Sequence, residues 1–463
     1  MESLNPNKLL KEEFVSNLNG SSMLEIAVLS TIVPGLMLLR HAISSYGITD
    51  IKSKISSKKD DDVLVPSKNW LFYLATVTVD FIFIVLPMIL FFSVLARWIY
   101  IFTIFLMILI FSTAAKRRYF SSHKEVGSIP LRENVSAYRV SMVIVTCLCI
   151  LAVDFRIFPR RYAKTETYGT SLMDLGVGSF VVANSLVSRQ ARNLLSRNWK
   201  NAVQSTSPLL LLGFGRLLST ASVDYQVHVG EYGVHWNFFF TLAAVSILTS
   251  IINVRPRYSG IFGLVILIGY QIWLICGLNV YLLSNERGTD VISKNKEGIF
   301  SIFGYWGMYL LGVQLGYYLF FGSNNHQTNL RSNNWARIRV WCLSLLFWLL
   351  TLLLDRHVER VSRRTCNLAY VTFVLAQNLQ VLAVLMLSDY VPGSKISTLE
   401  EAFNRNLLGS FLLANVLTGL VNLCVDTLFV PSLTSLFILL VYAYALSIIT
   451  GIADFCGIRL KFW

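Results

Sequence analysis

The stretch WLFYLATVTVDFIFIVLPMILFFSVLARWIYIFTIFLMILIFSTAA, residues 70–115, decides the fold class of this chain. It is apolar over about twice the length that crosses a hydrocarbon core of roughly 30 Å as one helix. Arg97 and Trp98 interrupt it. An arginine is costly at mid-bilayer and tryptophan favours the membrane interface, so these residues predict a turn between two spans, 70–94 and 98–115.

Composition extends this interpretation to the whole chain. Of its 463 residues, 54% are hydrophobic and only 14% are charged, against roughly 25% charged residues in a soluble domain. Apolar runs long enough to cross a bilayer recur from end to end, so we predict an all-α polytopic transmembrane helix bundle of about 13 spans, in one transmembrane domain over residues 1–463. Outside residues 70–115, the expected spans are 24–44, 138–157, 170–187, 205–221, 235–253, 260–283, 298–321, 336–354, 367–388, 406–424 and 432–457.

Charge patterning predicts the orientation. An odd number of spans places the termini on opposite sides, and the loops on the side of the C-terminus hold more Lys and Arg. The positive-inside rule then makes the C-terminus cytoplasmic and the N-terminus lumenal. Residues 47–69 are expected to form a cytoplasmic loop and residues 155–169 a lumenal functional loop. The net charge of +14 lies in short clusters between apolar runs, which excludes a nucleic-acid surface, and no Cys or His spacing fits a metal site.

The segment from Asp154 to Gly178 is the most polar part of the chain next to predicted spans. Asp154 and Asp174 lie at or inside expected helix ends, where an acid is costly unless it is paired or faces water. Such acids are candidates for function. The alternative is a loop in which Asp154 and Asp174 pair with Arg160 or Arg161 and fix the helix ends, and the residues of this segment leave both interpretations open.

A second polar segment leads into the expected span 235–253. His235, Trp236 and Asn237 combine a possible proton carrier, an interfacial aromatic ring and an amide at membrane depth. Glu231 is expected one helical turn before His235, where its carboxylate would set the imidazole tautomer. The alternative is a solvated histidine at the interface.

Two further sets of polar residues lie inside expected spans. Arg216 is costly there, and it is expected either to pair with Asp426 or to bind a phosphate. Asn415, Thr418 and Asn422 recur at helical spacing, so they share one helix face. We expect this face to turn inward, where the amides either bond between helices or line a site.

Six blocks of sequence resemble one known family. They are "AVDFRIFPRRYAKTETYGTSLMDLGVGSF" from Ala152, "EEFVSNLNGSSMLEI" from Glu12, "EYGVHWNFFFT" from Glu231, "NKEGIFS" from Asn295, "VSRRTCNLAY" from Val361 and "LLANVLTGLVN" from Leu412. In these blocks the chain resembles the glucosaminyl-phosphatidylinositol inositol acyltransferases of glycosylphosphatidylinositol (GPI) biosynthesis, the PIG-W family. Arg156 departs from the family pattern, in which proline is expected.

The resemblance implies a multi-pass enzyme of the endoplasmic reticulum membrane. Such an enzyme transfers a fatty acyl group, typically palmitoyl, from acyl-CoA to the inositol 2-hydroxyl of glucosaminyl-phosphatidylinositol. Acyl-CoA is then a co-substrate, and no permanently bound cofactor is expected. The expected partners are the two substrates and membrane lipid, and the oligomeric state is left open.

Acyl transfer to a hydroxyl needs a base, donors for the developing oxyanion and exclusion of water. We expect Asp154, aided by an ion pair with Lys164, to be the base; Lys164 alternatively faces the thioester oxygen, and His235 is the competing base. Arginine suits phosphate groups, which makes Arg160, Arg161 and Arg364 candidates for substrate binding. The other expected substrate contacts are Glu166, Asp174, Arg216, Glu231, Trp236, Asn237 and Asn415.

A transporter or flippase is the alternative from a different class of protein. Charges at membrane depth are equally natural in a transporter. The inverted repeats and broken helices typical of transporters are not evident in the two halves of the sequence. Motifs of other enzyme classes are also absent, including the P-loop, the nucleophile elbow and the zinc-protease helix.

Overall fold

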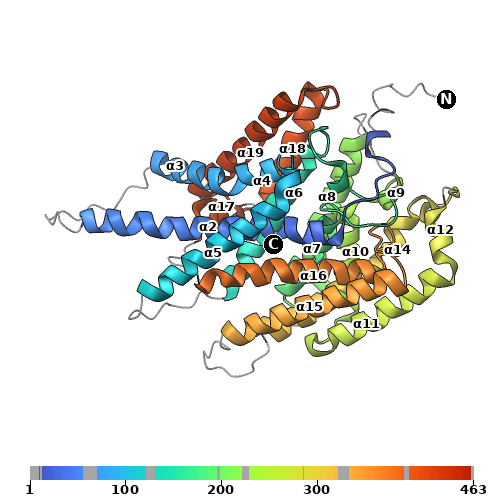
Figure 1. Cartoon of the computed structure of the whole chain (residues 1–463). Coiled ribbons are helices and arrows are strands. Elements are labelled where there is room, and N and C mark those ends of the chain that lie inside the picture. The colour runs from blue at the N-terminus through green and yellow to red at the C-terminus, as the bar shows by residue number, and fades with distance from the viewer. Residues whose placement is uncertain are drawn as a thin grey trace. The chain divides into compact units, whose positions relative to one another are not determined.

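The computed structural model is built of helices (Figure 1). The structure describes residues 10, 13–55, 70–120, 131–194, 199–221, 229–284, 286–321, 333–390 and 396–459. Within these ranges the extended contacts are isolated β-bridges of Gly20 and Ser21 with Thr170. The predicted all-α fold class is therefore confirmed for the described part of the chain.

The chain divides into two compact units. Unit 1 comprises the N-terminal residues to Met23, Arg160–Leu379 and the last two residues, and unit 2 comprises Leu24–Pro159 and Gln380–Lys461. The helix α16 (Leu368–Leu385) has residues in both units. The single transmembrane domain over residues 1–463 stays a prediction.

Every expected span corresponds to an apolar helix or a run of joined helical segments. Ten of the described helices are long and apolar enough to cross a membrane, and Leu175–Leu186, Thr206–Leu218 and Phe238–Ile252 form shorter apolar helices. The number of spans and the sides on which the termini lie stay predictions.

Unit 1 is arranged around the helix α14 (Lys296–Gly316), which packs against several other helices of the unit. Gly263 and Gly307 allow one of these close contacts, because a Cβ atom on Gly307 would lie 2.5 Å from the Leu267 side chain. The helices of unit 1 are α7 (Leu175–Leu186), α8 (Trp199–Ala221), α9 (Val229–Tyr232), α10 (Phe238–Ile252), α11 (Pro256–Trp273), α12 (Asn279–Leu283), α13 (Val291–Lys294), α14 and α15 (Asn333–His357), with shorter turns η3 (Arg160–Tyr162), η4 (Leu274–Leu278) and η5 (Tyr317–Phe321).

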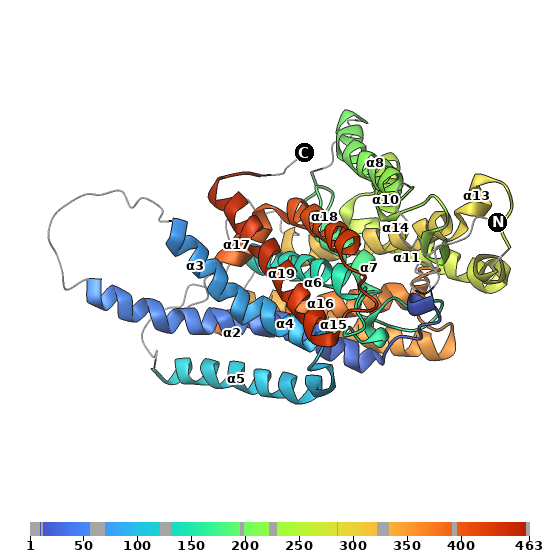
Figure 2. The same ribbon diagram turned by 90° about the horizontal axis from the view of Figure 1, so that it is seen from above.

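Figure 2 shows α8 beside α10 in unit 1, and these two helices pack against each other. Asn237 fixes the start of α10, because its side-chain oxygen accepts hydrogen bonds from the backbone N–H groups of Phe239 and Phe240. Its amide donates to the carbonyl of Gly213 in α8, 2.9 Å away. The predicted substrate contact Asn237 therefore has a structural role in joining two helices.

Unit 2 confirms the predicted turn at Arg97 and Trp98, since α4 ends at Phe91 and α5 begins at Ile99. In this unit α19 packs against α3, α17 and α18, and α6 packs against α18. The elements are α2 (Met23–Ile55), α3 (Trp70–Asp80), η1 (Phe81–Val85), α4 (Leu86–Phe91), η2 (Ala96–Trp98), α5 (Ile99–Phe120), α6 (Leu131–Ala152), η6 (Met386–Tyr390), α17 (Thr398–Arg405), α18 (Leu407–Cys424) and α19 (Ser432–Phe455).

The loop expected at residues 47–69 is shorter in the structure. Helix α2 continues beyond its apolar part to Ile55, so residues 47–55 are helical. Once a helix has formed, each added residue gains one backbone hydrogen bond, which favours this extension. Residues 56–69 lie outside the described residues.

Candidate functional site

The loop that follows Arg160 is held in unit 1 by main-chain hydrogen bonds from two other segments. The backbone N–H of Ser21 donates to the carbonyl of Thr170 at 2.7 Å, and that of Gly169 donates to the carbonyl of Val361 at 2.8 Å. Gly169 has φ +128°, and a Cβ atom on it would lie 2.3 Å from the carbonyl oxygen of Asn19. Glycine is required at this position because the backbone approaches too closely for a side chain.

This loop presents Lys164 to a chain of alternating charges, which we name the charged cluster: Lys164, Glu231, Arg363 and Asp174. The Lys164 Nζ atom lies 2.8 Å from both carboxylate oxygens of Glu231. Arg363 donates from Nη1 to Glu231 at 3.0 Å and from Nε to Asp174 at 2.9 Å. One guanidinium thus joins two carboxylates, which is the forked geometry that arginine provides.

Burial differs along the charged cluster. The side chains of Arg363 and Asp174 are 3% and 1% exposed, whereas that of Lys164 is 39% exposed. The Thr165 hydroxyl donates a further hydrogen bond to Asp174, at 2.8 Å. The cluster is therefore sealed at Asp174 and open at Lys164.

The environment of the cluster lowers the pKa of two of its members, Glu231 and Lys164, for different reasons. Burial raises the pKa of Glu231, but the charges of Lys164 and Arg363 outweigh it and lower the pKa to about 2. Partial loss of hydration lowers the pKa of Lys164, and so does the like charge of Arg363. The charge of Glu231 raises this pKa but does not offset the other two effects. Lys164 therefore gives up its proton more readily than an ordinary lysine.

The low pKa of Glu231 predicts that acid weakens unit 1. The ionised carboxylate contributes its full stabilisation above its ordinary pKa of 4.5, and this contribution is lost as the pH falls toward 2. The difference corresponds to roughly 3 kcal/mol. We expect the gap in unfolding free energy between the intact protein and Glu231→Gln to shrink between pH 6 and pH 3, measured by chemical denaturation in detergent. A gap that is constant with pH would contradict the assignment.

A second set of buried ion pairs lies in unit 1. Glu297 accepts hydrogen bonds from Arg364 at 3.0 Å and from Arg287 at 2.7 Å. The Arg364 guanidinium also donates to the carbonyl of Leu282 at 3.3 Å. Arg364, expected as a phosphate ligand, thus has a carboxylate partner in the structure.

The chain around His235 does not form one continuous helix. Helix α9 ends at Tyr232, and Gly233 has φ +107°, so Glu231 does not lie one helical turn before His235. The premise of a carboxylate-set tautomer is therefore wrong, because the glycine ends the helix. The backbone N–H of His235 donates to the Asn295 side chain at 2.8 Å, and the Trp236 indole donates to Thr241 at 2.9 Å.

Four other predicted site residues of unit 1 lie in or near the loop that follows Arg160, or affect the charged cluster electrostatically. The Arg160 guanidinium lies 4.0 Å from the ring centroid of Phe14, and that of Arg161 lies 4.9 Å from the ring of Tyr162. A carboxylate oxygen of Glu166 lies 3.5 Å from the position of a Cβ atom built on Gly230. The charge of Arg216 contributes to the low pKa of Glu231.

Asp154 belongs to unit 2, where Asn422 is its hydrogen-bond partner. The Asn422 amide donates to the Asp154 carboxylate at 2.8 Å, so part of the polar face expected on α18 meets the candidate base. Thr418 is buried, but Asn415 is exposed and donates to the carbonyl of Phe411 in its own helix, at 2.7 Å. The expectation that the whole face turns inward is therefore wrong at Asn415, whose amide is satisfied locally.

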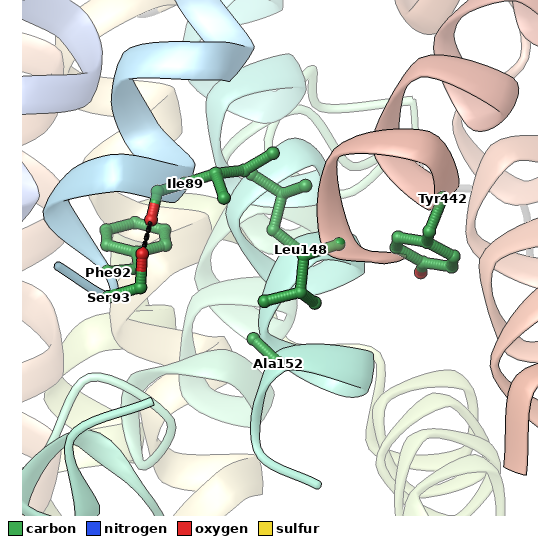
Figure 3. Close-up of a pocket in the computed structure, with 7 residues that line it drawn as sticks. Ile89, Phe92, Ser93, Leu148, Ala152 and Tyr442 are labelled. Carbon is green, nitrogen blue, oxygen red and sulfur yellow. Dashed lines mark hydrogen bonds between the residues drawn. The ribbon is translucent and has the colours of Figure 1, made fainter. Parts of the chain in front are cut away.

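Unit 2 also contains a narrow apolar pocket (Figure 3). Its volume is about 10 Å³, close to that of one water-sized sphere. In Figure 3 the Ser93 hydroxyl turns back to the carbonyl of Ile89, and the distance between these atoms is 2.6 Å. The pocket thus presents mainly hydrocarbon. Its lining residues are Ile89, Phe92, Ser93, Leu148, Ala152, Leu439 and Tyr442.

Within the described ranges, no group of three or more His, Cys, Asp or Glu is placed to hold a metal ion. The chemistry supported by these residues is proton transfer and the binding of charged groups.

The sequence of the chain matches the GWT1 family model over residues 7–453. The chain belongs to the GWT1 family. It is 59% identical over 432 residues to an uncharacterised protein of Arabidopsis thaliana, covering 92% of this chain and 98% of the relative. It is 38% identical to the phosphatidylinositol-glycan biosynthesis class W protein of Dictyostelium discoideum, covering 70% and 74%. It is 36% identical to the GPI-anchored wall transfer protein 1 of Candida glabrata, covering 95% and 96%.

Membership of the GWT1 family confirms the resemblance found in the six sequence blocks. It does not assign roles to single residues. The structure shows which of the predicted residues meet: Lys164, Asp174 and Glu231 are joined through Arg363. Arg363 was not among the predicted site residues, although its place beside Arg364, just before a predicted span, was a signal for it.

Proposed function

We propose that this protein acts in GPI-anchor biosynthesis as a membrane acyltransferase. In this proposal it moves a fatty acyl group, such as palmitoyl, from acyl-CoA to the inositol 2-hydroxyl of glucosaminyl-phosphatidylinositol in the endoplasmic reticulum. The names of relatives that align with most of the chain support the pathway, and the resemblance of the six blocks supports the reaction.

The position of Lys164 is the structural observation that carries the proposal. Its ammonium group is held by Glu231 on one side, while its side chain stays 39% exposed. A fixed cation with one open side suits an oxygen atom on which negative charge develops. We assign Lys164 to the carbonyl oxygen of the thioester.

The proposed reaction is direct transfer. Asp154 accepts the proton of the inositol hydroxyl as its oxygen attacks the thioester carbon. The new C–O bond forms, the C–S bond breaks, and the proton passes to the departing thiolate to give free coenzyme A. No covalent enzyme intermediate is needed, because the thioester is already activated. The Asn422 amide donates a hydrogen bond to the Asp154 carboxylate, which orients the proposed base.

The apolar pocket of unit 2 has a limited role in the same proposal, because it is small. Its lining includes Ala152, the last residue of α6, which precedes Asp154 by two positions. Hydrocarbon walls favour an alkyl chain and exclude water. A volume of about 10 Å³ admits only part of a chain, so we assign this pocket to the protection of Asp154 from water.

The test is acyl transfer from radiolabelled palmitoyl-CoA to glucosaminyl-phosphatidylinositol by the purified protein. We expect Lys164→Ala to lower kcat by about 10²–10³-fold, the usual loss when one oxyanion donor is removed, with a smaller change in KM. Lys164→Arg keeps the charge and should retain more activity.

Lys294→Ala is the matched control, because Lys294 is a half-buried lysine of the same unit outside the charged cluster. It should behave as the intact protein does. Full activity of Lys164→Ala would remove Lys164 from the reaction, and the absence of acylated lipid with the intact protein would overturn the proposed function.

A further inference from the structure

Five arginines lie at the end of unit 1 at which α7 and α14 finish. We name this set the arginine face: Arg189, Arg192, Arg255, Arg257 and Arg339. Arg189 and Arg192 follow the end of α7, Arg255 and Arg257 lie at the start of α11, and Arg339 lies in the first turns of α15. The Gln190 amide donates to the carbonyl of Val254 at 2.6 Å, which joins the first two pairs of arginines.

The centre of the arginine face is η5, the π-helical turn that ends α14. The guanidinium of Arg192 lies 5.7 Å from the ring centroid of Phe321, and that of Arg339 lies 4.7 Å from the ring of Tyr318. Gln314, in the last turn of α14, donates to the carbonyl of Arg257 at 3.3 Å. The aromatic rings of one turn therefore carry two cations, and the hydrogen bond from Gln314 holds the backbone of Arg257 beside the same part of the unit.

In the segments that carry the arginine face, the described residues include no Asp or Glu that could neutralise it. Among the described residues, the five arginines form no ion pair with Asp or Glu. The sequence contains no acid in residues 187–204, 252–260 or 314–341. In the opposite end of the same unit, by contrast, every cation of the charged cluster has a carboxylate partner.

Retention of basic loops on one side of a membrane explains part of this charge. It does not require guanidinium groups in particular, nor their positions on aromatic rings. A flexible lysine would satisfy the positive-inside rule equally well, whereas arginine held in a plane favours the bidentate binding of phosphate oxygens.

We propose that the arginine face binds the phosphate groups of an anionic ligand. Two sources share this chemistry, the phosphates of coenzyme A and the headgroup of an anionic phospholipid. The first rests on the proposed function, since it would anchor the acyl donor by its nucleotide end. Helix α7 runs between the charged cluster and the arginine face, and its 12 residues measure about 18 Å. The 21 residues of α14 measure about 31 Å, so the path along α7 is the shorter of the two.

The test uses the full chain in nanodiscs and the triple variant R192Q/R257Q/R339Q. One arm measures the binding of free coenzyme A, which cannot donate an acyl group, and of 3′-dephospho-coenzyme A in phosphatidylcholine nanodiscs. The other arm compares the enrichment of phosphatidylserine around the protein in nanodiscs of mixed phosphatidylcholine and phosphatidylserine. Arg356→Gln is the matched control, since Arg356 is an exposed arginine at the opposite end of α15.

We expect the triple variant to lose at least tenfold in affinity for one of the two probes, with a loss that decreases as salt rises. A loss confined to coenzyme A identifies the nucleotide phosphates, and a loss confined to phosphatidylserine identifies the lipid. Unchanged binding of both probes, in a variant that unfolds at the temperature of the intact protein, would overturn the proposal.

Single arginine variants replace the triple variant if it does not fold, and each is expected to lose a smaller part of the affinity. Because the readout is binding, it is separate from the proposed reaction. Binding of coenzyme A through the arginine face without acyl transfer would leave this inference standing and remove the proposed function.

Discussion

Replacement of Asp154 by asparagine is expected to lower the rate of acyl transfer by about 10²–10⁴-fold, the range that a positioned general base contributes. Asparagine keeps the size of the side chain and can still bond to the Asn422 amide, which donates to Asp154 at 2.8 Å. It cannot accept the inositol proton. The measurement is single-turnover acyl transfer in detergent, together with substrate binding and the unfolding temperature, both of which should change little.

Asp426→Asn provides the matched control for this prediction. Asp426 is an exposed acid of the same unit, just beyond the end of α18, and its replacement should leave the rate within about twofold of that of the intact protein. If Asp154→Asn were as active as this control, the role of base would pass to His235. In that case His235→Gln would show the large loss.

The fold could be predicted well because the physical signal is repeated many times. Each apolar run is long enough to require a helix in lipid, where every backbone polar group has to be satisfied within the segment. Even the turn at Arg97 and Trp98 followed from the cost of one charge. The ends of helices were harder to predict. Helix α2, for example, continues to Ile55, beyond the last residues of its apolar run.

The short helices could not be predicted in this way. Helix α17 has eight residues, too few for a membrane span. It is held by polar contacts between segments far apart in sequence, including Glu400 with His41 at 2.9 Å and the N–H of Leu399 with Asp80 at 3.0 Å. Such pairs leave no periodic signal in the sequence, since each depends on tertiary packing.

The candidate site was predictable in composition but not in pairing. The cost of an acid near the membrane singled out Asp174, the position one turn before His235 singled out Glu231, and the family resemblance added Lys164. The expected partners of Asp174 were Arg160 and Arg161, which are near it in the chain. Its observed partner is Arg363, 189 residues away, because folding and not sequence distance decides which cation reaches a buried carboxylate.

Arg363→Gln should therefore destabilise unit 1 more than any exposed arginine variant. The change removes the cation that joins Asp174 and Glu231, whose side chains are 1% and 13% exposed. Removing one partner of a buried ion pair costs roughly 3–5 kcal/mol, because the remaining charge stays desolvated. Arg363→Lys should lose less, since it keeps the charge but cannot donate to both carboxylates in the same forked geometry.

Two free cysteines allow this loss to be located within the chain. Cys366 is buried in unit 1, three residues from Arg363, and Cys147 is buried in unit 2. Under mild denaturant, mass spectrometry should find faster alkylation of Cys366 in Arg363→Gln than in the control Arg356→Gln, with a smaller change at Cys147. Equal protection of Cys366 in both variants would mean that the charged cluster does not stabilise unit 1, and the ion pairs would then serve only to position Lys164.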